Sequence, residues 1–375
     1  MDTSNSSVMS TDEIFENELR DVGFYHGYIT YVEADELLVN DGDYLLRRSG
    51  AVPNSICLVL SVRTDMGVKH FCIVTNDTQQ CFVTPEHKEK SITDLINYYQ
   101  TSQRPINIRT YALLQKPVPR PAWLIDHKAI FVVEKLNEGA FTEVLLANYF
   151  SSKGKMQVAV KMLKTMNDRS VRLFLGEARM MRKLAHKNVV TMLGIAVHEN
   201  PLLIVMEYCE GGSMLSYLRD NGAQMDAAMK LRFAIDVADG LSFLEKRNCI
   251  HGDIKTRNCL ITSENVVKIT GFLPVESSVK WLAPETLQDG VYSVKSDVWA
   301  FGVLLWEIYA NGEEPYPEMD LEQTRNMVLN TFTTMRMPQG TPLPISCVSM
   351  RCWIRDPRMR PLMSTLHEQL KKMEK

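Results

Sequence analysis

Residues 250–285 contain three short segments with side chains that could transfer a phosphoryl group. The segments span 250–258, 267–273 and 281–285. The first holds Asp253, a carboxylate that could accept a proton, and Asn258 five positions later, whose amide oxygen could bind a metal ion. Phosphoryl transfer depends mainly on positioning and on neutralising charge with Mg²⁺. The second segment contains Gly271-Phe272-Leu273 and no carboxylate that could bind a metal ion.

These segments resemble the catalytic core of protein kinases. Residues 250–258 resemble the H-R-D-L-x-x-x-N loop, with Gly252 in place of its arginine, and residues 283–285 match the closing A-P-E motif. Gly271 replaces the aspartate of the D-F-G motif, which the resemblance identifies as the main metal ligand. Residues 271–282 form a short activation segment without tyrosine. We therefore expect a kinase fold that no longer uses activation-loop switching.

From residue 123 to 375 the chain resembles the Fes/Fer group of cytoplasmic, non-receptor protein tyrosine kinases. The local matches are close at 204–207, 296–307 and 323–325. The resemblance leaves Asn258 as the remaining metal ligand. The catalytic residues that it implies are Asp253, Asn258, Lys161, Glu177 and Arg257. The ATP-binding residues that it implies are Gly139, Val144, Ala159, Lys161, Met206, Glu207, Cys209 and Leu260.

The resemblance also shows what has changed and what remains. Only Gly139 is left of the three glycines in the phosphate-binding loop, where Asn137 and Thr142 replace the others. Glycine lets a backbone approach phosphates closely, and β-branched threonine is a poor substitute. Lys255 stands where serine/threonine kinases keep a lysine near the transferred phosphate. The positions that serve packing in the family are retained, namely His251, Phe272, Glu285, Asp297 and Arg360.

Residues 24–29 and 42–49 resemble the opening of an SH2 domain. This implies a phosphotyrosine site made by Arg47, Ser49 and His70. Arg47 follows an apolar run, and a guanidinium fork fits a phosphate bidentately. Strand periodicity places Ser49 on the same face and Arg48 on the other. The structural alternative is that Arg47 pairs with an internal carboxylate. Tyr31 and Cys72 stand where many relatives carry cations, so we expect modest affinity.

The predicted fold class is α+β, an SH2 domain with a central antiparallel sheet and two flanking helices, followed by a bilobal kinase fold. We expect a polar lead at 1–22, the SH2 domain at 23–114 and an extended, proline-rich linker at 115–127. The kinase-like domain would span 128–375, with an N-lobe at 128–208 and a C-lobe at 213–375. The main expected elements are strands at 44–46, 56–62 and 70–74, and helices at 32–39, 91–99, 170–184 and 298–310.

Composition agrees with a globular signalling protein. The chain has 375 residues, 45% of them hydrophobic, and a net charge of −3 gives no reason to expect nucleic acid as a partner. Eight cysteines without a C-x-x-C pair indicate neither a zinc site nor a disulfide framework. No signal peptide or transmembrane segment is predicted, and Asp2 excludes N-myristoylation. We expect a cytoplasmic location.

Three functions remain open at this point. The leading hypothesis is an SH2–pseudokinase that binds tyrosine-phosphorylated proteins and presents a kinase-shaped surface to other signalling proteins or kinases. It would bind ATP weakly, with doubtful use of Mg²⁺ or Mn²⁺. The alternative is an active non-receptor tyrosine kinase that transfers the ATP γ-phosphate through an atypical metal arrangement, using Asn258 and Lys255. The third is a scaffold that binds neither phosphotyrosine nor nucleotide.

Overall fold

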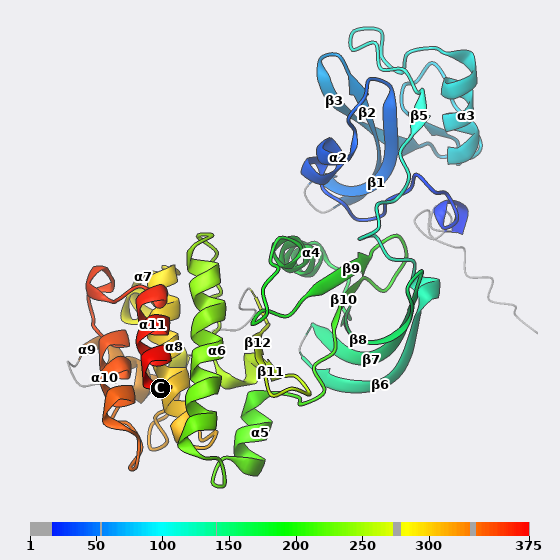
Figure 1. Cartoon of the computed structure of the whole chain (residues 1–375). Helices are drawn as coiled ribbons and strands as arrows, with labels where there is room; N and C mark the ends of the chain where they lie inside the picture. Colours follow the sequence, from blue (N-terminus) through cyan, green and yellow to red (C-terminus); the bar gives the residue numbers. More distant parts are fainter. Residues whose placement is uncertain (1–16, 53–54, 140, 273–278, 331–334, 375) are drawn as a thin grey trace, which may run out of the picture. The chain divides into compact units, whose positions relative to one another are not determined.

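The computed structural model describes residues 17–52, 55–139, 141–272, 279–330 and 335–374 (Figure 1). The chain forms two compact units, one of residues 1–174 with 193–205 and one of residues 175–192 with 206–375. Most of the predicted polar lead lies outside the described residues, but Leu19 is buried in the first core. No helix in the described ranges combines the length and the hydrophobicity that crossing a bilayer requires.

The first sheet has the strand order β4-β3-β2-β1-β5, with antiparallel pairing from β1 to β4. Helix α2 starts with a capping box between Thr30 and Glu33, and Ser91 caps α3. The apolar face of α3 packs into the core with the strands. The elements are α2 Tyr31–Leu37, β1 Asp43–Val52, β2 Ser55–Thr64, β3 Gly67–Thr75, β4 Cys81–Phe82, α3 Ile92–Ser102 and β5 Lys116–Pro117.

The structure extends several predicted elements. Strand β1 continues beyond the predicted 44–46 through the arginine pair, and α3 runs to Ser102, past its last buried residue, Tyr99. The prediction for the linker needs a correction. Its first residues do not form a free spacer, since Lys116 and Pro117 pair in parallel with Asp43 and Tyr44 of β1. Proline is tolerated there because β5 is an edge strand.

The second sheet follows the linker and has the order β6-β7-β8-β10-β9. Its buried residues include Val158 and Val160 of β8 and Val205 of β10. Helix α4 covers most of the predicted helix at 170–184, beginning and ending two residues earlier. The elements are a 3-10 helix at His127–Ala129, then β6 Ile130–Glu138, β7 Thr142–Ser151, β8 Gly154–Leu163, α4 Asp168–Arg182, β9 Met192–Ala196 and β10 Leu203–Glu207.

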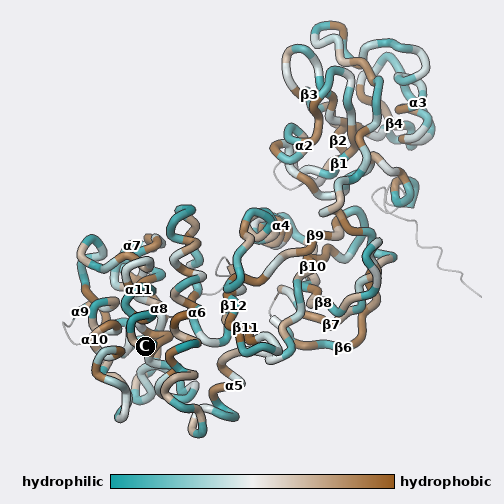
Figure 2. Tube along the Cα trace, viewed as in Figure 1, coloured by the Kyte–Doolittle hydropathy of each residue, from teal (hydrophilic) through white to brown (hydrophobic). Residues whose placement is uncertain are grey.

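The remaining residues are mainly helical. Helix α8 contains most of the predicted buried helix at 298–310 and is almost entirely enclosed. Figure 2 shows that hydrophobic residues follow the strands of both sheets. The elements are α5 Met214–Asn221, α6 Ala227–Glu245, β11 Cys259–Ile261, β12 Val267–Ile269, α7 Pro284–Asp289, α8 Val294–Tyr309, α9 Leu321–Asn330, α10 Leu343–Cys352 and α11 Met363–Met373, with 3-10 turns at Thr256–Asn258, Val279–Trp281 and Pro357–Met359.

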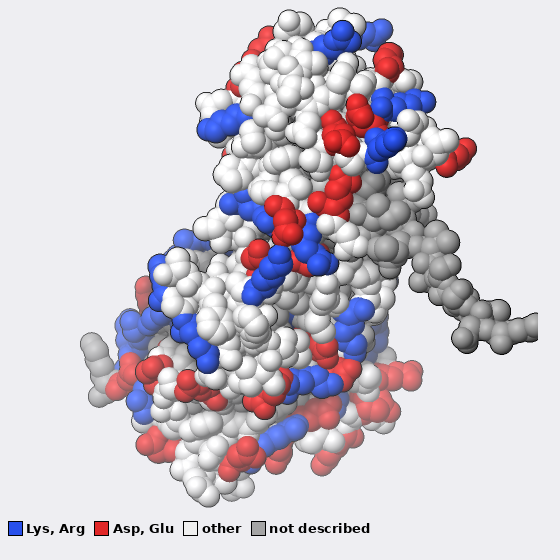
Figure 3. All heavy atoms as spheres, turned by 90° about the vertical axis from the view of Figure 1, so that its right-hand side faces the viewer, with Lys and Arg blue, Asp and Glu red and all other residues white. Residues whose placement is uncertain are grey.

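Within the first unit, the N-terminal sheet region contacts the turn after β9. The amide of Tyr28 donates to the Val197 carbonyl at 2.9 Å. Gly27, at φ +66°, permits this approach, because a Cβ there would collide with the Val197 backbone. Two ion pairs flank the contact, Arg20 with Glu199 at 3.0 Å and Asp21 with Lys128 at 2.8 Å. On the face drawn in Figure 3, acidic and basic side chains are interspersed.

Candidate functional sites

Arg47 lies in a polar cluster to which three neighbouring strands contribute. Its Nε donates to Ser61 Oγ at 3.0 Å, and Ser61 Oγ lies 2.9 Å from Nδ1 of His70. Its Nη1 donates to the Ile29 carbonyl at 3.4 Å. Among the described residues Arg47 makes no ion pair with a carboxylate, so the alternative of an internal salt bridge is wrong for this part of the chain. A buried guanidinium therefore remains available to an anion.

Arg48 has a different role from Arg47. Its Nε donates to the hydroxyl of Tyr25 at 3.1 Å, and its guanidinium carbon lies 5.7 Å from the centre of the Tyr28 ring. These contacts agree with the predicted alternation of the two arginines and make Arg48 a packing residue. Ser49 is next along β1 and pairs with Cys57 of β2. Its participation in phosphate binding stays a prediction.

The two positions that lack cations border the Arg47 cluster. Tyr31 begins α2, and its ring centre lies 6.3 Å from that of His70. Cys72 Sγ lies 3.7 Å from Sγ of Cys57. Burial, followed by the charge of Arg47, lowers the pKa of His70, so the imidazole is neutral near pH 7. Among the described residues of this cluster, Arg47 is then the permanent cation. Sequence reasoning missed Ser61, a polar residue in an otherwise apolar strand that signals an inward polar contact.

Both oxygens of the Asp253 carboxylate are engaged. Lys255 Nζ lies 2.6 Å from Oδ1, and Asn258 Nδ2 donates to Oδ2 at 2.7 Å. The same amide nitrogen also donates to the Asp253 carbonyl at 2.7 Å. Lys255 is buried, and it makes a further contact with Trp281, whose ring centre is 5.7 Å from Nζ. The fourth predicted residue of this loop, Arg257, is exposed.

Gly271 lies two residues after the end of β12 and is close to Asn258 of this loop. Its φ is +79°, a region that aspartate and asparagine enter more readily than other side chains. A Cβ there would lie 3.0 Å from Cγ and Oδ1 of Asn258. A carboxylate at 271 would thus meet the metal-ligand position, and glycine supplies none. Mg²⁺ prefers octahedral oxygen ligands that usually include carboxylates. The residues around Asn258 do not fit that requirement, because Asp253 is already paired with Lys255.

The polar framework beneath the loop is intact. The Asp297 carboxylate accepts the amides of His251 and Gly252 at 2.8 and 2.9 Å, and burial raises its pKa to about 7. His251 Nε2 lies 3.0 Å from the Thr270 carbonyl, and its ring packs against Phe272. Arg360 binds Glu285 through two nitrogens, at 2.6 and 2.8 Å. The packing positions named from the sequence thus make the expected kind of contact.

Four of the predicted nucleotide-binding residues lie in the first unit. Val144 of β7 pairs directly with Lys161 of β8, and Ala159 is two positions earlier on β8. Gly139 follows β6, and its amide donates to the Thr142 carbonyl at the start of β7 at 2.8 Å. The sheet register therefore brings Val144 and Lys161 together.

The other predicted nucleotide-binding residues lie in the second unit. Met206 and Cys209 are buried, and burial raises the pKa of the Cys209 thiol to about 12. Glu207 accepts the Thr191 amide at 2.6 Å and pairs with Lys268 at 3.0 Å. Leu260 of β11 forms a bridge with residue 213, just after this segment. Glu177 is buried on α4. Its pairing with Lys161 stays a prediction.

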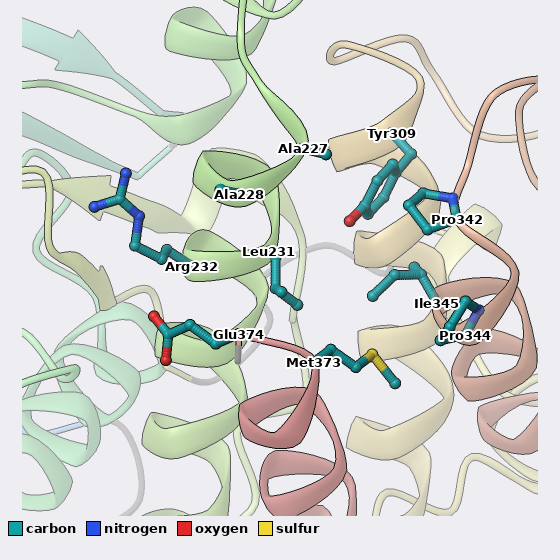
Figure 4. Close-up of a pocket in the computed structure, with 10 residues that line it drawn as sticks. All are labelled: Ala227, Ala228, Leu231, Arg232, Tyr309, Pro342, Pro344, Ile345, Met373 and Glu374. Carbon is teal, nitrogen blue, oxygen red and sulfur yellow. The ribbon is translucent and has the colours of Figure 1, made fainter.

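The second unit also contains a cavity that lies away from the predicted site residues. It has a volume of about 460 Å³ and is formed by α6, α8, α10 and the end of α11. Figure 4 shows Leu231, Ile345 and Met373 projecting toward one another, with Tyr309 beside them. None of the residues predicted to bind nucleotide or phosphotyrosine lines it.

Comparison with known proteins agrees with the architecture. The model of the SH2 domain family matches residues 24–99, and the model of the protein tyrosine and serine/threonine kinase family matches residues 130–370. Fer-related kinase 1 of Caenorhabditis elegans is 40% identical over 98% of this chain and 97% of its own length. Human tyrosine-protein kinase Fer is 35% identical over 98% of the chain, and the Fps transforming protein of Fujinami sarcoma virus is 33% identical over 92%. The chain spans 46% and 41% of those two proteins.

Proposed function

Because the chain belongs to the Fer/Fps family of non-receptor tyrosine kinases, with an SH2 domain before the kinase domain, we propose that it is a phosphotyrosine-binding scaffold whose kinase domain is catalytically impaired. The observation that carries this proposal is the arrangement of residues around Asp253. Position 271 has no carboxylate, and the carboxylate of Asp253 is paired with buried Lys255. The domain keeps the framework of a kinase and lacks the main ligand for its metal.

The expected loss of rate is large. Kinases typically turn over at about 1–100 s⁻¹. Losing a metal ligand removes several kcal/mol of transition-state stabilisation, and each 1.4 kcal/mol corresponds to about tenfold in rate. We therefore expect any residual activity to be reduced by roughly 10³-fold or more. ATP binding would rely on Lys161 and on backbone groups at residues 206–209. We place the protein in the cytoplasm, where its eight free cysteines would remain reduced.

One observation favours an active kinase with an unusual metal arrangement as the second candidate. Lys255 Nζ lies beside the carboxylate of the predicted base, where a cation could neutralise part of the charge on a transferred phosphoryl group. In that case Asn258 would hold a single metal ion. The lysine would then have to leave Asp253 whenever substrate binds.

Two measurements separate these functions. If the protein is a scaffold, ATP alone and ATP plus excess Mg²⁺ should raise its melting temperature by nearly the same amount. The stabilisation by a ligand depends on its affinity for the folded protein, and Mg²⁺ should add little to the affinity for ATP. Phosphorylation of an acidic tyrosine peptide should stay near background. If the wild type transfers phosphate at ordinary rates and Asp253→Asn abolishes the transfer, the scaffold proposal is wrong and the active kinase is right.

A further inference from the structure

The start of the kinase-like region and the turn after β9 bring two histidines and a glutamate together. His127 belongs to the 3-10 helix before β6, and His198 and Glu199 follow β9. One ligand atom from each of the three lies within 4.8 Å of the other two. His198 Nε2 is 3.5 Å from Glu199 Oε1, and Asp126 Oδ1 is 3.8 Å from the same nitrogen. All these residues lie in the first unit.

Each of the three residues has one buried polar atom with no hydrogen-bond partner among the described residues. They are Nδ1 of His127, Nε2 of His198 and Oε1 of Glu199, and each is buried. The His198 side chain is 2% exposed. Buried polar atoms nearly always find a partner, because leaving one unpaired costs about 1–3 kcal/mol. Three such atoms on residues whose ligand atoms lie within 4.8 Å of one another therefore call for a bound group.

The outer contacts fit a metal ion. The other nitrogen of His127, Nε2, lies 2.9 Å from the Pro201 carbonyl. A donated hydrogen bond there leaves Nδ1 as a lone-pair donor, the arrangement common to metal-binding histidines. Glu199 uses Oε2 to pair with Arg20, which leaves Oε1 for the ion.

We infer that His127, His198 and Glu199 bind a divalent transition metal of the zinc type, with Asp126 or water as the fourth ligand. Two ligands about 2.1 Å from a tetrahedral ion lie roughly 3.4 Å apart, close to the 3.5 Å between His198 Nε2 and Glu199 Oε1. Two imidazoles and one or two carboxylates suit Zn²⁺ better than Mg²⁺ or Ca²⁺. The cysteine pattern gave no sign of this site, because its ligands are not cysteines and come from segments 70 residues apart.

The ion would join the linker to the turn whose Val197 carbonyl accepts the amide of Tyr28 from the SH2 domain. Binding would then strengthen the packing of the SH2 domain on this part of the kinase domain. Arg120 lies close enough for its charge to lower the pKa of His198, and it opposes a cation. The carboxylates of Glu199 and Asp126 offset that charge.

The test uses the full chain, stripped with a chelator and titrated with Zn²⁺ against a competing indicator, and separately with Co²⁺. We expect one tightly bound equivalent and a Co²⁺ spectrum without thiolate charge-transfer bands. His198→Ala and Glu199→Gln should each weaken binding by roughly 100-fold or more, since even loss of an outer contact costs about 10–100-fold. His87→Ala is the matched control, because His87 pairs with Glu89 at 2.8 Å but has no second histidine beside it in the described part of the chain.

Because His198 is buried, Glu199→Gln supplies the variant that preserves shape, and thermal melting in chelator shows whether each variant is folded. Zn²⁺ should raise the melting temperature of wild type and of His87→Ala, and not that of Glu199→Gln. Equal Zn²⁺ affinity in wild type and Glu199→Gln would overturn the assignment. Thiolate bands that disappear in Cys57→Ser/Cys72→Ser would also overturn it and would indicate cysteine ligands. A wild type that binds no Zn²⁺ would also overturn it.

Discussion

Lys255 Nζ lies 2.6 Å from Oδ1 of Asp253, and the side chain of the lysine is only 1% exposed. The carboxylate of the predicted catalytic base is thus part of an internal ion pair beside Trp281. Burial lowers the pKa of Lys255, and the charge of Asp253 is the largest effect that opposes this shift. The pair makes Asp253 a structural residue as well as a candidate base, and the two roles can be separated by mutation.

We predict that Lys255→Met and Asp253→Asn each destabilise the kinase domain, because each leaves a largely buried charge without its partner. The double variant should lose less stability than the sum of the two, with a coupling of about 1–3 kcal/mol. Urea unfolding followed by tryptophan fluorescence measures this, since all five tryptophans lie at or after residue 123. Strict additivity would show that the pair contributes nothing in solution.

Gly271→Asp should restore a metal response without restoring a kinase. The backbone at 271 already has the left-handed conformation that aspartate tolerates, and the new carboxylate would face Asn258. We expect Mg²⁺ to add to the thermal shift by ATP in this variant. Activity should stay far below ordinary rates, because Asn137, Thr142 and the short activation segment are unchanged.

Gly271→Ala is the control for that experiment. It adds a Cβ at the same place, with the same 3.0 Å contact to Asn258, but no carboxylate. Its left-handed backbone should cost about 1–2 kcal/mol, so its melting temperature falls and Mg²⁺ has no additional effect. A Mg²⁺ response in the alanine variant would mean that the ion binds elsewhere.

Substitutions of the two adjacent arginines should impair different properties, peptide affinity for Arg47 and stability for Arg48. Arg47→Ala should lower the affinity for phosphotyrosine peptides by about 2–5 kcal/mol, since a doubly charged group loses its main partner. Arg48→Met should lower the melting temperature, because the Tyr25 hydroxyl loses its donor, and should leave peptide affinity nearly unchanged in the folded fraction. Fluorescence anisotropy with phosphorylated and unphosphorylated peptide decides. If Arg48→Met alone removes binding, the pocket has been assigned to the wrong arginine.

His26 should make the SH2 domain sensitive to acid. Its side chain is fully buried, and burial lowers its pKa from 6.5 to about 4. Because the folded-state pKa lies below the unfolded-state value, the stability that the neutral His26 ring contributes is complete above pH 6.5 and is lost as the pH falls toward 4. The contribution of His26 should fall by about 2 kcal/mol between pH 7 and pH 5.

The measurement is hydrogen exchange of β1 and β2 amides at both pH values, corrected for the intrinsic exchange rate. Wild type should lose protection on acidification more steeply than His26→Asn, whose amide can still donate to the Phe24 carbonyl that His26 Nδ1 contacts at 3.1 Å. His87→Asn serves as the control, because that ring is only partly buried. If wild type and His26→Asn lose amide protection equally on acidification, His26 is not the cause of the acid sensitivity.

Local periodicity was enough to predict that Arg47 and Arg48 make different contacts, because a strand alternates its faces whatever it packs against. It was not enough for Ser61, which meets His70 only once the register of β2 and β3 is known. The spacing of Asp253 and Asn258 predicted their proximity, but the burial of Lys255 depends on Trp281, far along the chain. The pairing of the linker with β1 and the His127–Glu199 cluster likewise depend on contacts between distant segments.

The parallel pairing of β5 with β1 gives the linker a mechanical role. The strand that carries Arg47 is held at its outer edge by Lys116 and Pro117, and the Val118 amide donates to the Tyr44 carbonyl at 2.9 Å. The SH2 family match ends at residue 99, so a fragment cut there would expose an open strand edge on the strand that carries Arg47, the predicted phosphate ligand. In the intact chain, tension on the residues after 120 would pull directly on the backbone of β1. A peptide bound at Arg47 and a force on the linker would therefore act on the same strand.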